Sequence, residues 1–348
     1  MGKKKSVFEC SECGHQEPKW LGRCPSCGRW NSLIELHLPD GASGSGGQVG
    51  GRPGRTSRGS GRGGGAAGAA GGASSGRQAS NPTPLSKIDS TAGRRWETGI
   101  GEMDRVLGGG ITVGSSILIG GEPGIGKSTL MLQLASAVMT GGPVAYVSGE
   151  ESAGQIRMRA ERLGLVGRAA GRTTGSPSEP HLICDTDLER IIGLLRKMEA
   201  KVAVVDSIQT LLSAEAGNVP GTVNQLKYGC YELIDWAREN DTALFLVAHV
   251  TKEGSIAGPK VIEHMVDTVL YFDQASSGLR ILRAVKNRFG SVDEIGIFTM
   301  EREGLIQVAD PASYFLEQRE EVPPGIAAAP VYEGSRVLMV EIQDRKST

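Results

Sequence analysis

One loop constrains the fold of this 348-residue chain more than any other feature. It reads Gly121-Glu122-Pro123-Gly124-Ile125-Gly126-Lys127-Ser128-Thr129 and fits the phosphate-loop pattern G-x-x-x-x-G-K-[ST]. An apolar run, Ile117 to Ile119, precedes the loop, and Leu130 to Met139 follows it with apolar residues spaced as on one face of a helix. Strand, loop and helix in this order predict an α/β domain with a nucleotide site. The alternative is a Gly-rich turn without a ligand.

The residue types of the loop follow from the chemistry of phosphate binding. Glycines allow backbone N–H groups to converge on phosphate oxygens, and the helix that follows directs the positive end of its dipole at the same anion. Lys127 would reach the β- and γ-phosphates, and Ser128 would offer its hydroxyl to Mg²⁺. We therefore expect residues 121–129 to bind ATP with magnesium.

Two further strands are predicted to end in carboxylates near this loop. The run Lys201 to Ser207 reads as a buried strand closed by Asp206, which has the form of a Walker B segment and would hold Mg²⁺ through water. The run Val144 to Ser148 ends in Gly149-Glu150-Glu151, at the edge of the sheet where open α/β folds bind ligands. We expect Glu150 to polarise the attacking water because it lies two residues past the strand. Glu151 is the second choice, and an acidic pair at a helix N-terminus is the alternative for both.

The next βα units lead to a histidine at a strand end. The pattern predicts a strand at His181 to Cys184, helices at Leu188 to Met198 and Val223 to Glu239, and a strand at Ala243 to Val247. His249 follows that strand and would sense the γ-phosphate, although a core or capping role remains open. The polar, Gly-rich segment 251–260 is too long for a plain connection, and its Lys252 and Lys260 would meet a nucleic acid backbone.

The strands predicted to finish this domain surround a pair of cations. They are Thr268 to Phe272, Leu279 to Val285 and Glu294 to Thr299, and Lys286-Asn287-Arg288-Phe289-Gly290 lies between the last two. On a tight turn, Lys286 and Arg288 would reach the ATP of a neighbouring subunit as a finger in trans. Exposed charge on a hairpin is the alternative.

Four of the six cysteines form two C-x-x-C pairs near the N-terminus. They are Cys10, Cys13, Cys24 and Cys27, and four thiolates in this arrangement suit tetrahedral Zn²⁺. A reactive redox dithiol is the alternative. Trp20 and Trp30 would pack over so small a core or stack on DNA bases, and packing is favoured. Cys184 and Cys230 are expected to be small buried side chains.

Composition and charge differ along the chain and predict its division into segments. Residues 1–81 carry eleven Lys and Arg against five Asp and Glu. Segment 39–81 is rich in Gly, Ser and Arg and cannot offset the entropy cost of ordering, so we expect a disordered linker. We predict a zinc module at 1–38, an ATPase domain at 82–320 and a tail at 321–348. No run approaches about 20 uninterrupted apolar residues, so we expect a cytoplasmic protein with no membrane contact.

Together these motifs resemble the bacterial RadA (Sms) family of DNA repair proteins. The resemblance rests on the four-cysteine module, the loop Gly121 to Thr129 and the signature Lys286 to Gly290, and the lead-in Thr98 to Gly110 is similar to that of RecA-like ATPases. It implies a RecA-like core with a mainly parallel sheet and a zinc-ribbon-like module. It also implies a homo-oligomeric ring, hexameric in this reading, that uses ATP to move on single-stranded and branched DNA beside a RecA-type recombinase.

The C-terminal end departs from the family pattern. The run Gly334 to Gln343 resembles only the first strand of the Lon-protease-like domain that the family usually carries. Two other functions stay open. One is a nucleotide switch whose zinc module docks protein partners, as in the related clock ATPases, and the other is a form that binds ATP but, without the terminal domain, builds no ring.

Overall fold

The computed structural model describes the parts of the chain that carry the predicted motifs, with some gaps. The described residues are 6–10, 15–26, 28–30, 32–37, 84, 94–138, 140, 142–166, 179–217, 222–249, 261–275, 278–311 and 326–343. The predicted linker 39–81, the ligands Cys13 and Cys27 and the segment 251–260 with Lys252 and Lys260 lie outside them.

The predicted mainly parallel sheet is confirmed, and it has nine strands in the order β14-β13-β12-β11-β6-β10-β9-β7-β8. Six neighbouring strands run parallel: β11 (Thr268–Gln274), β6 (Ser116–Gly121), β10 (Ala243–His249), β9 (Val202–Asp206), β7 (Val144–Ser148) and β8 (His181–Cys184). An antiparallel extension follows β11: β12 (Arg280–Asn287), β13 (Ile295–Glu301) and β14 (Gly304–Gln307). The sequence pattern did not identify β14.

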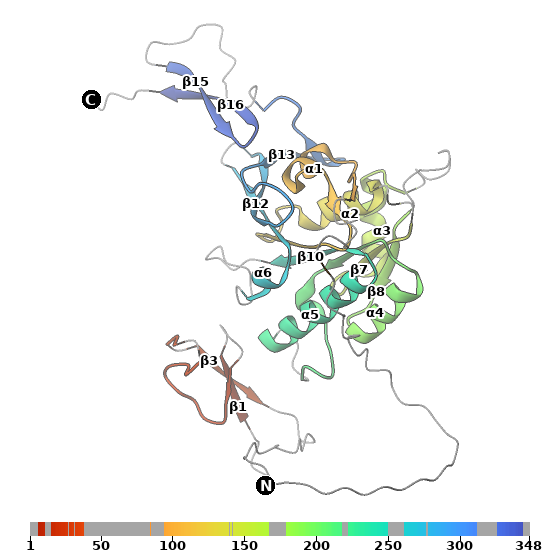
Figure 1. Cartoon of the computed structure of the whole chain (residues 1–348), viewed down its shortest axis with the longest axis vertical. Coiled ribbons are helices and arrows are strands. Elements are labelled where there is room, and N and C mark those ends of the chain that lie inside the picture. Colours follow the sequence, from red (N-terminus) through yellow and green to blue (C-terminus); the bar gives the residue numbers. More distant parts are fainter. Residues whose placement is uncertain are drawn as a thin grey trace, which may run out of the picture.

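Helices cover both faces of this sheet because successive strand residues point to opposite sides. In β10, Phe245 and Val247 belong to one core cluster, whereas Leu244 and Leu246 belong to the other. Figure 1 shows α1, α2 and α3 on one side of the sheet and α4 and α5 on the other. The helices are α1 (Gly101–Leu107), α2 (Lys127–Ala137), α3 (Ala153–Arg162), α4 (Leu188–Lys197), α5 (Val223–Glu239) and the short α6 (Val261–Met265).

Side-chain caps fix where two of the helices begin. Ser152 and Gln155 form a capping box at the start of α3, and the Asp187 carboxylate accepts the Arg190 N–H at the start of α4.

The remaining elements of this domain are short. A three-residue 3₁₀ turn, η4 (Ile208–Thr210), follows β9, and two short strands, β4 (Arg95–Trp96) and β5 (Ile111–Thr112), pair beside α1. Within the described residues no helix is both long enough and apolar enough to cross a membrane.

A two-stranded hairpin, β15 (Ile326–Glu333) and β16 (Arg336–Gln343), packs against the antiparallel end of the core. Leu338 joins a small apolar cluster with Leu279 and Ile297, and the Arg336 guanidinium makes two hydrogen bonds, of 2.6 and 2.9 Å, to the buried Glu102 carboxylate of α1. The expectation that Gly334 to Gln343 is a first strand is wrong. The run forms the second strand of the hairpin, because the chain turns at Gly334 with a positive φ of 61°.

The N-terminal module is a three-stranded antiparallel sheet in the order β2-β1-β3, formed by β1 (Ser6–Cys10), β2 (Gln16–Glu17) and β3 (Leu33–His37). Its buried core consists of Cys10, Cys24 and Leu33, against which Phe8 packs. The favoured packing of the two tryptophans is wrong: Trp20 is 54% exposed and Trp30 is 71% exposed.

The two isolated cysteines differ in burial. Cys230 is buried in the second core cluster, as expected, but Cys184 is exposed. Its strand, β8, forms an edge of the large sheet, where one neighbour is missing.

Candidate nucleotide site

The phosphate loop runs from the end of β6 into the first turn of α2, at the carboxyl edge of the parallel strands. Gly124 and Gly126 have positive φ values of 80° and 115°, which other residues rarely adopt. A Cβ on Gly126 would also displace the tip of the Met300 side chain, whose Cε would lie 2.7 Å away, but the positive φ is what favours glycine there. The loop is held on its outer side by Arg280, whose Nε donates to the Ile125 carbonyl at 3.2 Å.

Lys127 is the buried cation of the loop. Its Nζ donates to the Gly121 carbonyl at 2.7 Å and to the Glu122 carbonyl at 2.9 Å. Burial lowers the pKa of Lys127, while the Asp206 carboxylate, and then the Glu150 carboxylate, act in the opposite direction. The three groups that sequence reasoning assigned to phosphate, metal and water therefore share one electrostatic environment.

Asp206 ends β9 and is buried next to a residue that sequence reasoning missed. The Tyr146 hydroxyl, from the neighbouring strand β7, donates a hydrogen bond of 2.6 Å to Asp206 Oδ2. Burial raises the pKa of Tyr146 well above its usual value, and the Asp206 carboxylate adds to the rise. Tyr146 is therefore a hydrogen-bond donor at neutral pH, and it fixes one carboxylate oxygen of Asp206. The only sequence signal is a single hydroxyl-bearing aromatic inside an apolar strand.

Ser128 and Thr129 follow Lys127 in the first turn of α2, and both are half-buried. Their position at the N-terminus of a helix that starts at the loop is the one that a hydroxyl ligand for Mg²⁺ requires. Asp206, at the end of the strand two places from β6, supplies a carboxylate to the same edge of the sheet. A hydroxyl and a carboxylate are oxygen donors of the kind that Mg²⁺ prefers, so these residues fit that metal.

The two candidate glutamates after β7 have different surroundings. Glu150 Oε1 accepts the Ser207 hydroxyl at 2.6 Å and lies 3.5 Å from His249 Nε2, so it is turned toward the ends of β9 and β10. Glu151 instead pairs with Arg159 of the helix that follows it, α3. The structure thus brings Glu150 together with His249 and Asp206 and turns Glu151 away from them.

Lys286 and Arg288 lie near the amino ends of the parallel strands, whereas the phosphate loop of their own chain lies at the carboxyl ends. Asn287 pairs with Thr268, which pairs with Ile117 at the start of β6, whereas the loop begins at Gly121. Four residues of strand correspond to about 13 Å. The two cations are therefore separated from the nucleotide site of their own chain.

The surroundings of these two cations differ from the expected exposed turn. Lys286 lies within β12, and its Nζ donates to the carbonyls of Glu263 and Val266 at 2.8 and 2.7 Å, which closes the end of α6. Burial lowers the pKa of Lys286, and Arg288 adds to the fall, while Asp267 opposes it. Arg288, just past β12, pairs with Asp267 at 3.1 Å.

The Asp267 carboxylate accepts hydrogen bonds from several groups near Lys286 and Arg288. Its Oδ2 also accepts the Ser116 N–H at 3.0 Å and the Ser116 hydroxyl at 2.7 Å, and its Oδ1 lies 3.3 Å from Arg238. Asp267 precedes β11 and reads as a loop residue, so the sequence offered no sign of this role.

Two of the four predicted zinc ligands are described, and they lie together. Cys10 and Cys24 are both buried in the core of the N-terminal module. Gly28 N–H donates to the Cys24 carbonyl at 2.9 Å, with a positive φ of 75° at the glycine, which gives the tight turn expected after a C-x-x-C pair. Two buried thiols in a module with so small a core fit a structural Zn²⁺. The described residues contain no cluster of three metal-binding side chains, as expected when Cys13 and Cys27 lie outside them.

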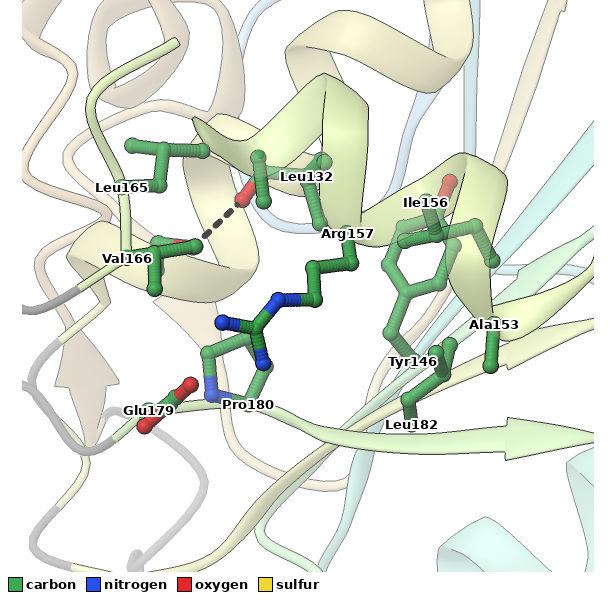
Figure 2. A pocket seen from close by; sticks show the side chains of 12 residues that line it. Leu132, Tyr146, Ala153, Ile156, Arg157, Leu165, Val166, Glu179, Pro180 and Leu182 are labelled. Atoms are coloured by element: carbon green, nitrogen blue, oxygen red, sulfur yellow. Dashed lines mark hydrogen bonds between the residues drawn. The ribbon is translucent and has the colours of Figure 1, made fainter. Parts of the chain in front are cut away.

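A cavity of about 260 Å³ lies beside this site, between α2, α3 and the strands β7 and β8. Figure 2 shows Tyr146 and Leu182 at one end of it and Arg157 extending toward Pro180 at the other. No residue of the phosphate loop lines the cavity. It is therefore distinct from the nucleotide site and touches it only through Tyr146.

Comparisons with known proteins agree with both modules. A family model of ATPases described as KaiC matches residues 96–312, and a model described as a rubredoxin metal binding domain matches residues 8–35. "DNA repair protein RadA" of Treponema pallidum is 48% identical over 345 residues, which cover 98% of this chain and 67% of that protein. The protein of the same name from Pseudomonas aeruginosa is 43% identical over 344 residues, with 99% and 68% covered.

The chain thus spans about two thirds of the length of these relatives. Among solved structures, a RadB recombinase matches 61% of this chain and 99% of its own, with 25% identity and a TM-score of 0.47.

Proposed function

The chain belongs to the family of DNA repair proteins named RadA, and from this premise we propose that it is a DNA-dependent ATPase of recombinational repair. In this proposal it translocates on single-stranded DNA and promotes branch migration of recombination intermediates, beside a RecA-type recombinase and in the cytoplasm. The observation that carries the proposal is the convergence of Lys127, Asp206 and Glu150 at one edge of the sheet.

Each residue of the site has a distinct role in ATP hydrolysis. Lys127 exchanges the carbonyls of Gly121 and Glu122 for β- and γ-phosphate oxygens, which its buried ammonium can stabilise strongly because little water screens it. Ser128 and Asp206 would hold Mg²⁺, which would supply positive charge next to the phosphate oxygens. Tyr146 keeps Asp206 oriented for this role.

Glu150 orients and polarises the attacking water. Its carboxylate is fixed by the Ser207 hydroxyl and remains 47% exposed, so a water molecule can reach it. His249 lies within 3.5 Å of the same carboxylate, and its Nδ1 is buried without a hydrogen-bond partner among the described residues. We propose that His249 senses the γ-phosphate through Glu150 and transmits its loss to segment 251–260, whose Lys252 and Lys260 are expected to meet a nucleic acid backbone.

Lys286 and Arg288 complete the site of a neighbouring subunit in a homo-oligomeric ring, for which we propose six subunits. Their position at the far edge of the sheet supports action in trans, because a head-to-tail ring places one edge of each subunit against the opposite edge of the next. A cation supplied in this way stabilises the charge of the transition state.

The experiment that tests the proposal is ATP turnover by the 348-residue chain with and without single-stranded DNA. We expect DNA to increase turnover in the parent, and Lys127→Ala to abolish turnover under both conditions. Tight nucleotide binding with slow turnover that DNA does not change would overturn the proposal and favour a nucleotide switch.

The domain boundaries stay a prediction: a zinc module at 1–38, a linker at 39–81, an ATPase domain at 82–320 and a last segment at 321–348.

A further inference from the structure

The N-terminal module exposes two indole rings side by side. Trp20 is 54% exposed and Trp30 is 71% exposed. Gly22 lies between them: a Cβ at this glycine would meet Trp20 at 3.7 Å and Trp30 at 3.8 Å, so the edges of both rings approach one point. The two residues are ten positions apart in sequence but adjacent in space, and together they form one aromatic surface.

Neither indole is needed to fill the core of the module. That core consists of Cys10, Cys24 and Leu33 with Phe8 against it. Exposing a large aromatic side chain forgoes roughly 2 kcal/mol of burial energy, so a pair of exposed indoles on so small a module indicates a binding surface. The indoles are therefore available to a ligand.

An arginine holds this surface in place. Arg23 Nε donates to the Gly28 carbonyl at 2.8 Å, and its guanidinium lies 5.8 Å from the centre of the Trp30 ring. Such a cation is attracted to the ring and places positive charge beside the exposed aromatic surface.

Charge identifies the kind of ligand. Between residues 15 and 30 the exposed cations are Lys19, Arg23 and Arg29. The one carboxylate in that range, Glu17, is paired with His15 at 2.9 Å. A positive surface with flat aromatic rings suits a polyanion that carries stackable bases, which describes single-stranded nucleic acid.

We propose that Trp20 and Trp30 form a stacking platform for the unpaired bases of single-stranded DNA, with Lys19 and Arg23 contacting the phosphates. The inference rests on the proposed function, because it gives the zinc module a share in holding the strand on which the ATPase acts. Stacking uses the flat face that every base possesses, so the platform binds DNA without regard to sequence.

The test is binding of the whole zinc-loaded chain to labelled oligothymidylate and to an abasic oligomer of equal length. Trp20→Ala with Trp30→Ala should weaken oligothymidylate binding by about fivefold or more for each indole and leave the abasic oligomer unaffected. Trp20→Phe with Trp30→Phe should retain most of the affinity, because phenylalanine still stacks. Tyr332→Ala removes an aromatic that is 75% exposed outside the module and serves as the matched control.

The outcomes separate this inference from the function on which it rests. If DNA stimulates ATP turnover and the double alanine variant, with zinc bound, retains parental affinity for oligothymidylate, the platform is refuted and the indoles serve a protein partner. If the phenylalanine variant loses as much affinity as the alanine variant, stacking is refuted. If DNA does not stimulate turnover but affinity depends on bases and on both indoles, the platform stands and the ATPase proposal falls.

Discussion

Glu150→Gln tests the assignment of the attacking water. The glutamine keeps an oxygen that accepts the Ser207 hydroxyl, now bonded at 2.6 Å, so we expect the free energy of unfolding to change by less than about 1 kcal/mol. Loss of the negative charge removes the group that we propose polarises the attacking water. Such a group contributes about 10²- to 10⁴-fold, which corresponds to about 2.7 to 5.4 kcal/mol of barrier. We expect kcat to fall by that factor while the Kd for ATP stays within about threefold.

The matched control is Glu151→Gln, one residue along the chain. Glu151 pairs with Arg159 of α3, whose Nη1 is already buried without a partner among the described residues. We expect this variant to lose about 1 to 2 kcal/mol of stability and to keep kcat within about threefold. Single-turnover hydrolysis, with nucleotide binding measured by a fluorescent ATP analogue, separates the two effects. A large loss of kcat in Glu151→Gln, or a parental kcat in Glu150→Gln, would refute the reasoning from geometry.

Three further predictions concern groups around the site. Tyr146→Phe removes the donor to Asp206 and should lower the free energy of unfolding in urea by about 1.5 to 3 kcal/mol; an unchanged midpoint would contradict it. Arg336→Met leaves the buried Glu102 carboxylate without its bidentate partner and should weaken docking of the hairpin by about 3 to 5 kcal/mol, seen as faster amide exchange in β16. Cys24→Ser should abolish co-purification of zinc while ATP binding persists, and retained zinc would argue against four thiolate ligands.

Periodicity predicted the elements that carry the nucleotide site. The helix expected at Val223 to Glu239 has those bounds in the structure, as do the strands Val144–Ser148 and His181–Cys184. The helix is long and amphipathic and the strand Val144–Ser148 is buried throughout, so local sequence determines both. Because parallel strands end at the same edge of a sheet, the sequence pattern also predicts Asp206 and Glu150 at one edge.

What the sequence did not predict depends on contacts between distant segments. Tyr146 reads as a core aromatic, and only the register of β7 against β9 brings its hydroxyl to Asp206. Lys286 was expected on a turn, but β12 continues through it by pairing with β11, where Lys286 lies opposite Val269, and its ammonium closes the end of α6. That helix has five residues, too few for a helical period to be recognised.

The exposed indoles of the N-terminal module show that sequence alone did not predict which of its residues are buried. In a module of this size two buried cysteines occupy the space that aromatic side chains usually fill, so hydrophobic character alone did not determine which residues are buried. Trp20 and Trp30 were therefore misassigned to the core.

The central claim is that a neighbouring subunit completes the nucleotide site, and mixing two inactive variants tests it most directly. Glu150→Gln keeps the finger but lacks the group that activates water, and Arg288→Ala keeps that group but lacks the finger. Asp267 retains Ser116 and Arg238 after the second change, so Arg288→Ala should fold.

Each variant alone should have little DNA-stimulated turnover. In an equal mixture, random assembly makes about a quarter of the interfaces complete, so about a quarter of the parental turnover should return. A mixture that assembles but stays as inactive as its components, or an Arg288→Ala variant that is active alone, would contradict a finger acting in trans.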